Sequence, residues 1–182
     1  MNIVTNLLSV ILGAVALGAM MNTIPDYNSS FQPFAVVADD DGVGQGRLFT
    51  AKLVGLKTAG IVSYTRFGED VSRDTSATFL VADLSITGRS ESRQLEAIWL
   101  GATGRQYNQT ARLEDAPRNL STVRVEPGLT DRAIAVFEVP EDEIVGGQLA
   151  LIPRGRFPMD SAVHFAGPAS VPEKQAELRL EP

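Results

Sequence analysis

Short runs of alternating apolar and polar residues, separated by Gly, Pro, Asn and Asp, fill the chain beyond residue 30. Successive side chains of such a run point to opposite faces, as they do in a β-strand. No long stretch keeps the 3.6-residue period of an amphipathic helix. The alternation therefore predicts an all-β body. The expected strands are Phe34–Ala38, Arg47–Leu56, Gly60–Arg66, Thr78–Thr87, Gln94–Leu100, Gln106–Leu113, Thr122–Val125, Arg132–Val139, Gln148–Ile152, Ala162–Phe165 and Ala176–Leu180.

The apolar residues of these strands fall mainly on one face. In "TFLVADLSIT" that face carries Leu80, Ala82, Leu84 and Ile86. A sheet buried mainly on one side has this pattern, and many short strands favour two such sheets packed as a sandwich. Trp99 shares a face with other apolar residues, so we expect its indole to fill the space between the sheets.

Glycine and proline mark the turns between the expected strands. Gly101 to Gly104 should form a hairpin loop, and Pro140 with Gly146-Gly147 should form another in "VPEDEIVGGQLAL". The final "AELRL" either closes the sandwich or adds a strand to a neighbour's sheet.

Three stretches, "ATFLVADLSITGRSE", "LEAIWLGATGRQYNQT" and "PGLTDRAIAVFEVPED", together resemble a bacterial family of immunoglobulin-like domains of unknown function. Its members occur on lipoproteins, extracellular antigens and membrane-anchored proteins. The shared features are Phe79–Ile86, Trp99, Gly104, Tyr107, Pro127-Gly128 and Phe137–Pro140, within a region from Phe49 to Ile152. Gly88 replaces the family's usual Asn, and the tail from Pro153 is extra. The resemblance implies an immunoglobulin-like β-sandwich outside the cytoplasm, used for binding or support.

The segment from Ile3 to Ile24 contains no charged residue and is long enough for the roughly 20 residues of a membrane span. Only Met1-Asn2 precedes it, without the Lys or Arg of a signal peptide. We therefore expect residues 1–24 to be a transmembrane helix or uncleaved signal anchor, 25–46 a linker with the first strand, and 47–182 the sandwich. The alternative is a cleaved signal peptide, with a mature terminus near Ala19 to Asn22.

Small residues four apart in this segment, Ser9 with Gly13 and Ala14 with Gly18, would let another helix approach closely. No Lys or Arg occurs before Arg47, which favours an extracytoplasmic, periplasmic position for the sandwich.

The composition limits the chemistry. The chain has no cysteine, one histidine and a net charge of −6, and it lacks a basic run, so we expect no nucleic-acid partner. Clustered Asp39, Asp40 and Asp41 could hold Ca²⁺, although a solvated acidic turn explains them as well. His164 should lie on the face opposite the core. Arg154 and Arg156 could contact a partner's carboxylates.

Carboxylates gather at the end of the "FEVP" strand, where we expect Glu138, Glu141, Asp142 and Glu143 to be hydrated rather than an acid–base pair. The sequence thus predicts no catalytic residue and no cofactor. It favours a non-enzymatic, single-pass accessory subunit that braces or caps a larger membrane complex, such as an energy-transducing one. The alternatives are a secreted binding module, and an enzyme with a pocket near His164 or the acidic turn.

Overall fold

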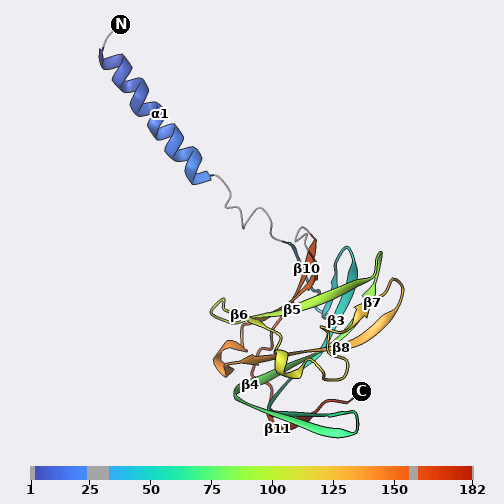
Figure 1. Cartoon of the computed structure of the whole chain (residues 1–182). Helices are drawn as coiled ribbons and strands as arrows, with labels where there is room; N and C mark the ends of the chain where they lie inside the picture. The colour runs from blue at the N-terminus through green and yellow to red at the C-terminus, as the bar shows by residue number, and fades with distance from the viewer. Residues whose placement is uncertain (1–2, 24–32, 156–159, 182) are drawn as a thin grey trace. The chain divides into compact units, whose positions relative to one another are not determined.

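The computed structural model describes residues 3–23, 33–155 and 160–181. These residues divide into two compact units, Met1–Gln32 and Pro33–Pro182. The first contains the helix α1 (Ile3–Thr23), and the second contains the strands (Figure 1).

Helix α1 has no charged residue, and its described side chains, from Val10 to Met21, are exposed. Gly13, Ala14 and Gly18 are among them, and a Cβ placed on either glycine would meet no atom within 4 Å. Ser9 also lies on α1, but its side chain is outside the described part. Among the described residues, no helix combines the length and apolarity that a membrane crossing requires. The transmembrane helix predicted for residues 1–24 is therefore not confirmed.

The strands of the second unit form two sheets, which confirms the predicted all-β sandwich. The six-stranded sheet has the order β1-β10-β9-β5-β6, with β7 beside β5. Its strands are β1 (Phe34–Val37), β5 (Arg93–Leu100), β6 (Gln106–Asn108), β7 (Arg124–Val125), β9 (Gln148–Pro153) and β10 (Ser161–Ala166). The pairing of β1 with β10 is parallel, and the other pairings are antiparallel.

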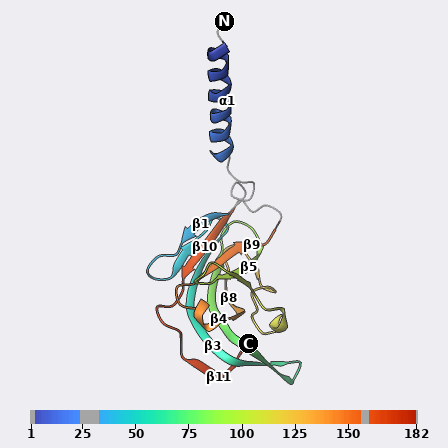
Figure 2. The ribbon, with the colours of Figure 1, turned by 90° about the vertical axis from the view of Figure 1, so that its left-hand side faces the viewer.

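The five-stranded sheet has the order β11-β3-β4-β8, with β2 beside β3. Its strands are β2 (Val43–Gln45), β3 (Phe49–Arg66), β4 (Glu69–Gly88), β8 (Thr130–Val139) and β11 (Lys174–Arg179). Strand β11, from the "AELRL" run, pairs in parallel with β3 of its own chain. Figure 2 shows β1 and β10 at one end of the sandwich and β11 at the other.

Two predictions about strand connections were wrong. The stretches Arg47–Leu56 and Gly60–Arg66 were predicted as two strands, but Phe49–Arg66 is one strand, whose pairing with β4 shifts register beside glycines 55 and 60 without breaking. The "VPEDEIVGG" segment is no hairpin, since β8 pairs with β4 and β9 pairs with β5 and β10. It crosses between the sheets through the short 3₁₀ helix η2 (Glu141–Glu143).

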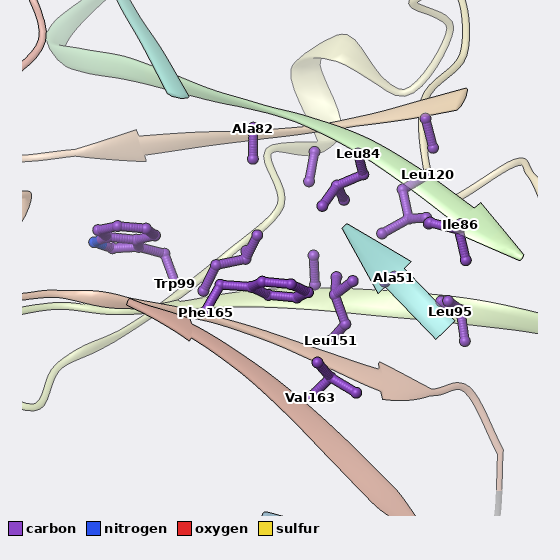
Figure 3. Packing of buried hydrophobic residues seen from close by; sticks show 14 of the residues in the cluster. Ala51, Ala82, Leu84, Ile86, Leu95, Trp99, Leu120, Leu151, Val163 and Phe165 are labelled. Carbon is purple, nitrogen blue, oxygen red and sulfur yellow. The ribbon is translucent and has the colours of Figure 1, made fainter. Parts of the chain in front are cut away.

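The main core fills the space between the sheets. Ala82, Leu84 and Ile86 of β4 face Trp99, Phe165 and Leu151 of the six-stranded sheet (Figure 3). Trp99 is fully buried, as predicted, and its Nε1 donates to the Glu143 carbonyl at 3.0 Å. Burial of these large side chains is the main favourable term in the folding of the sandwich.

A second core covers the outer face of the five-stranded sheet. Phe79, Val81 and Ile134 point away from the main core and are buried beneath Leu113 and Leu178. Leu113 belongs to the 3₁₀ helix η1 (Ala111–Leu113), where the sequence predicted a continued strand. This sheet is thus buried on both faces at its centre, unlike the one-sided burial predicted.

Candidate functional site

A cleft of about 200 Å³ lies beside β5, where neither β6 nor β7 pairs with it. Leu95 and Ala97 of β5 border the cleft, but their side chains are buried in the main core, whereas the exposed Ala111 of η1 gives the cleft an apolar side chain. Two exposed carboxylates, Glu96 and Glu114, also line the cleft. Charges of both signs are present, because the exposed Arg154 also lines it.

Two side-chain amides hold the cleft together. Gln109 Oε1 accepts from the Ala97 amide at 3.2 Å, and its Nε2 donates to Asn119 Oδ1 at 3.3 Å. Asn119 is 2% exposed, and its Nδ2 donates to the Leu113 carbonyl at 2.7 Å. The hydrogen bonds of the half-buried Gln109 and the buried Asn119 fix the shape of the wall. The cleft is thus built to keep its form before anything enters it.

Arg154, predicted as a partner contact, is therefore at the edge of a structured cleft. Its backbone amide donates to the Gln94 carbonyl at 2.8 Å, which extends the β5–β9 pairing past Pro153. Arg156 lies outside the described residues. Sequence reasoning found the arginine but not the cleft, because the cleft's other residues come from distant segments.

The outer face of the six-stranded sheet carries apolar side chains where a solvated face would be polar. One cross-strand row consists of Val37, His164, Ala150 and Ile98, and Ile152 lies beside it. Val37 is 77% exposed, whereas Ala150 is only 5% exposed beneath its neighbours. We call these five residues, together with Ala162, the outer apolar face. The sequence does indicate this face, because "EAIWL" of β5 and "LALIP" of β9 carry apolar residues on both faces of their strands.

His164 occupies the centre of that face, opposite the core as predicted. It is half-buried, and burial lowers the pKa of its imidazole below the ordinary value. His164 is consequently neutral at neutral pH, which makes it compatible with apolar neighbours.

The Asp39–Asp41 turn is exposed and is stabilised from within. Asp39 Oδ1 accepts from the amides of Val43 at 2.8 Å and Asp41 at 3.1 Å, and Gly42 has a φ of 71°. Among the residues that the structure describes, no three acidic, histidine or cysteine side chains gather closely enough to hold a metal. The weak Ca²⁺ hypothesis for this turn gains no support.

Two of the carboxylates expected to be hydrated are instead engaged. Burial alone would raise the pKa of Glu138, but hydrogen bonds from Thr110 and Thr75, together with the charge of Arg112, hold that pKa below its usual value. Glu143 is 3% exposed and accepts from the Thr103 hydroxyl and amide. Both carboxylates therefore bind neighbouring segments of their own chain.

Comparison with known proteins finds similarity to solved structures alone. No protein-family model and no curated protein matches the sequence. The yjhA protein of Bacillus subtilis is similar in structure, with 10% identity and a TM-score of 0.48 over 68% of this chain and 95% of that one. An uncharacterised β-sandwich protein of Clostridium difficile has 9% identity and a TM-score of 0.43, over 73% and 94%. A candidate lipoprotein of Staphylococcus aureus has 10% identity and a TM-score of 0.44, over 79% and 97%.

Proposed function

We propose that this chain is a non-enzymatic accessory subunit whose immunoglobulin-like sandwich braces or caps a larger membrane-associated assembly on the extracytoplasmic side. The observation that carries the proposal is the outer apolar face. The face combines the exposed Val37 with the half-buried Ile98 and Ile152. A contact with another protein that removes these side chains from water is favourable.

The partner that fits this face is a protein with an apolar patch bordered by basic side chains. The acidic turn Asp39–Asp41 begins two residues after Val37, so it borders the face with negative charge. A basic border on the partner would steer association and set its orientation. Neutral His164 at the centre suits an apolar contact.

Helix α1 contributes the second contact of the proposed subunit. Its described side chains are uncharged and exposed, so an apolar environment would favour them. We propose that α1 associates with the membrane or with a helix of the assembly, and that Gly13, Ala14 and Gly18 let that helix approach.

Photo-crosslinking tests this function in intact cells. Benzoylphenylalanine at position 98, within the outer apolar face, is expected to capture one defined membrane-associated protein. The matched control is position 54, because Val54 is 54% exposed and lies on the five-stranded sheet. Capture at both positions alike, or at neither, would refute the proposed contact.

The cleft beside β5 favours a second candidate, a secreted or surface module that binds a small ligand bearing both charges. The two candidate functions predict different N-termini for the mature chain. The intact mass of the cellular protein should include residues 1–24 for the accessory subunit. A mature terminus near Ala19 to Asn22 would instead support the secreted module.

A further inference from the structure

Strand β1 ends the six-stranded sheet, with β10 as its neighbour on one side (Figure 2). The amides of Phe34 and Ala38 donate to carbonyls on the β10 side, each at 2.8 Å. Because backbone groups alternate along a strand, those of Ala35 and Val37 point away from β10. No described residue forms a hydrogen bond with these outward-facing groups. The free edge of β1 therefore offers backbone donors and acceptors to another strand.

The side chains of β1 do not protect this edge. Phe34 is 65% exposed and Val37 is 77% exposed, and Ala35 between them is exposed as well. Sheets commonly protect an edge with charged side chains, a proline or a bulge. Phe34–Val37 contains neither a charged residue nor a proline, and its pairing with β10 is regular. An apolar edge with unpaired backbone groups is a site where a strand can add to the sheet.

The other margins of the two sheets are protected. Strand β8 is covered by residues 110–120, whose backbone donates to it at 2.8 to 2.9 Å. Strand β11 carries charged side chains at Lys174, Glu177 and Arg179. The exposed residues of β2, β6 and β7 are polar or charged. Among the described strands, β1 alone ends a sheet with large exposed apolar side chains.

We infer that β1 pairs with β1 of a second copy of this chain, antiparallel and about a two-fold axis at Val36. In this register Ala35 lies opposite the second copy's Val37, and Val37 lies opposite its Ala35. Residues opposite each other in this way exchange both of their backbone hydrogen bonds. A two-fold contact uses the same surface on both copies, so this one register satisfies the outward-facing groups of both edges.

The side chains fit the same register, which favours a second copy as the occupant. The small Ala35 lies opposite the larger Val37 on the outer side of the joined sheet. On the inner side, the exposed Phe34 lies opposite the second copy's Ala38. The pairing therefore removes from water the apolar side chains that β1 leaves exposed, which is favourable. It also joins the outer apolar faces of the two copies, because Val37 ends that cross-strand row.

The acidic turn Asp39–Asp41 decides the direction of the pairing. A parallel arrangement would set the two turns side by side. In the antiparallel register Asp39 lies opposite the second copy's Pro33, which separates the two turns by roughly 20 Å at 3.4 Å per residue. That distance exceeds the screening length of about 8 Å. Near Phe34 each turn meets Arg47 and Asp160, whose charges pair at 2.6 Å and cancel.

The contact is of the weak class by itself, because strands of four residues bury less than the roughly 1,200 Å² of a stable interface. Helix α1 can raise the local concentration of the chain. If α1 holds both copies in one membrane or micelle, as the proposed function states, the pairing becomes an encounter at high effective concentration. The dimer is therefore expected for the full chain rather than for dilute sandwich alone.

Engineered cysteines test the register, because the natural chain has none. Full-length A35C and V37C, carrying different tags, are mixed in mild detergent and oxidised. Opposite residues have Cα atoms about 5.5 Å apart, which a disulfide can bridge. Two copies of A35C, or two of V37C, place their cysteines on a diagonal of about 7–8 Å. We expect linked pairs in the mixture and few in either variant alone, and equal linkage in all three samples would overturn the inference.

Substitutions at position 35 test the pairing itself. A35P removes an outward-facing donor that β1 does not use with β10, and edge strands tolerate proline. A35K instead keeps the amide and adds the kind of charge that prevents edge pairing. We expect both variants to lose the dimer on sedimentation in the same detergent, whereas A35V retains it. The fluorescence of Trp99 shows whether each variant is folded, and a folded A35K that sediments as the natural chain does would contradict the inference.

A different occupant of the edge would also be seen. A35C that links to another protein in intact cells, and not to its own copy, would assign the β1 edge to that protein and overturn the inference. Capture from position 98 depends on the outer apolar face and not on the backbone of β1, so it should persist in A35K. The proposed function and this inference can therefore fail separately.

Discussion

Glu143 illustrates how one carboxylate joins two loops of the sandwich. Its side chain accepts from Thr103 in the β5–β6 loop, and its carbonyl accepts from the Trp99 indole in the core. The hydrogen bonds from the Thr103 hydroxyl and amide lower the pKa of Glu143 below its ordinary value. Protonation of the Glu143 carboxylate would weaken its hydrogen bonds from Thr103 and so loosen the β5–β6 loop.

This arrangement predicts a stability that declines in acid. The folded-state pKa of Glu143 lies below its unfolded value of about 4.3, so its contribution is complete above that pH and is lost as the pH falls through the folded pKa. Urea unfolding of E143Q should show reduced stability at pH 7 and a smaller deficit at pH 3. E141Q, at an exposed position of the same 3₁₀ helix, is the control. A deficit that is constant with pH would contradict the assignment.

At the scale of elements, the loop before β9 depends on a close approach to Trp99. Gly147 precedes β9, and a Cβ there would lie 2.6 Å from the indole ring. The ring cannot move away, because the main core surrounds it and its Nε1 is bonded to the Glu143 carbonyl. Here the absence of a side chain permits the packing.

G147A should therefore destabilise the sandwich by about 1–3 kcal/mol, the usual cost of overpacking a core. Thermal unfolding followed by tryptophan fluorescence measures the effect at the contact itself. G55A is the matched control, since a Cβ on Gly55 meets no atom within 4 Å, and its change should stay within about 0.5 kcal/mol. If G147A and G55A unfold alike, the close contact does not limit stability.

The sequence predicts these elements well where the signal is local. The burial of Trp99 between the sheets and the Gly101–Gly104 hairpin were both confirmed. Alternating residues and turn residues are local signals, so the sequence shows them directly. Strand β4 was only partly predicted, because its first half is polar and remains mainly exposed although it pairs with β3. The cleft was not predicted, since Glu96, Gln109 and Arg154 meet only through long-range pairing.

The whole sandwich has two hydrophobic cores with different supports. The main core is enclosed by both sheets, whereas the second core is covered by η1 and by the edge strand β11. Near the C-terminus, the second core is covered by Leu178 and Leu180, which are 9% and 6% exposed. A cover made by an edge strand should open more readily than a sheet-to-sheet interface.

L178A tests whether the second core is an independent unit of stability. Removing a buried leucine at an edge should cost about 2 kcal/mol, the low end for such truncations. We expect hydrogen exchange to quicken at Val62, Tyr64 and Leu113, which pack in the second core, while amides of β5 and β9 keep their protection. Q175A, at an exposed position of β11, should leave both sets unchanged. Local opening exposes to exchange only the amides of the region that loses its contacts. If L178A instead accelerates amide exchange equally throughout the sandwich, both cores unfold as one cooperative unit.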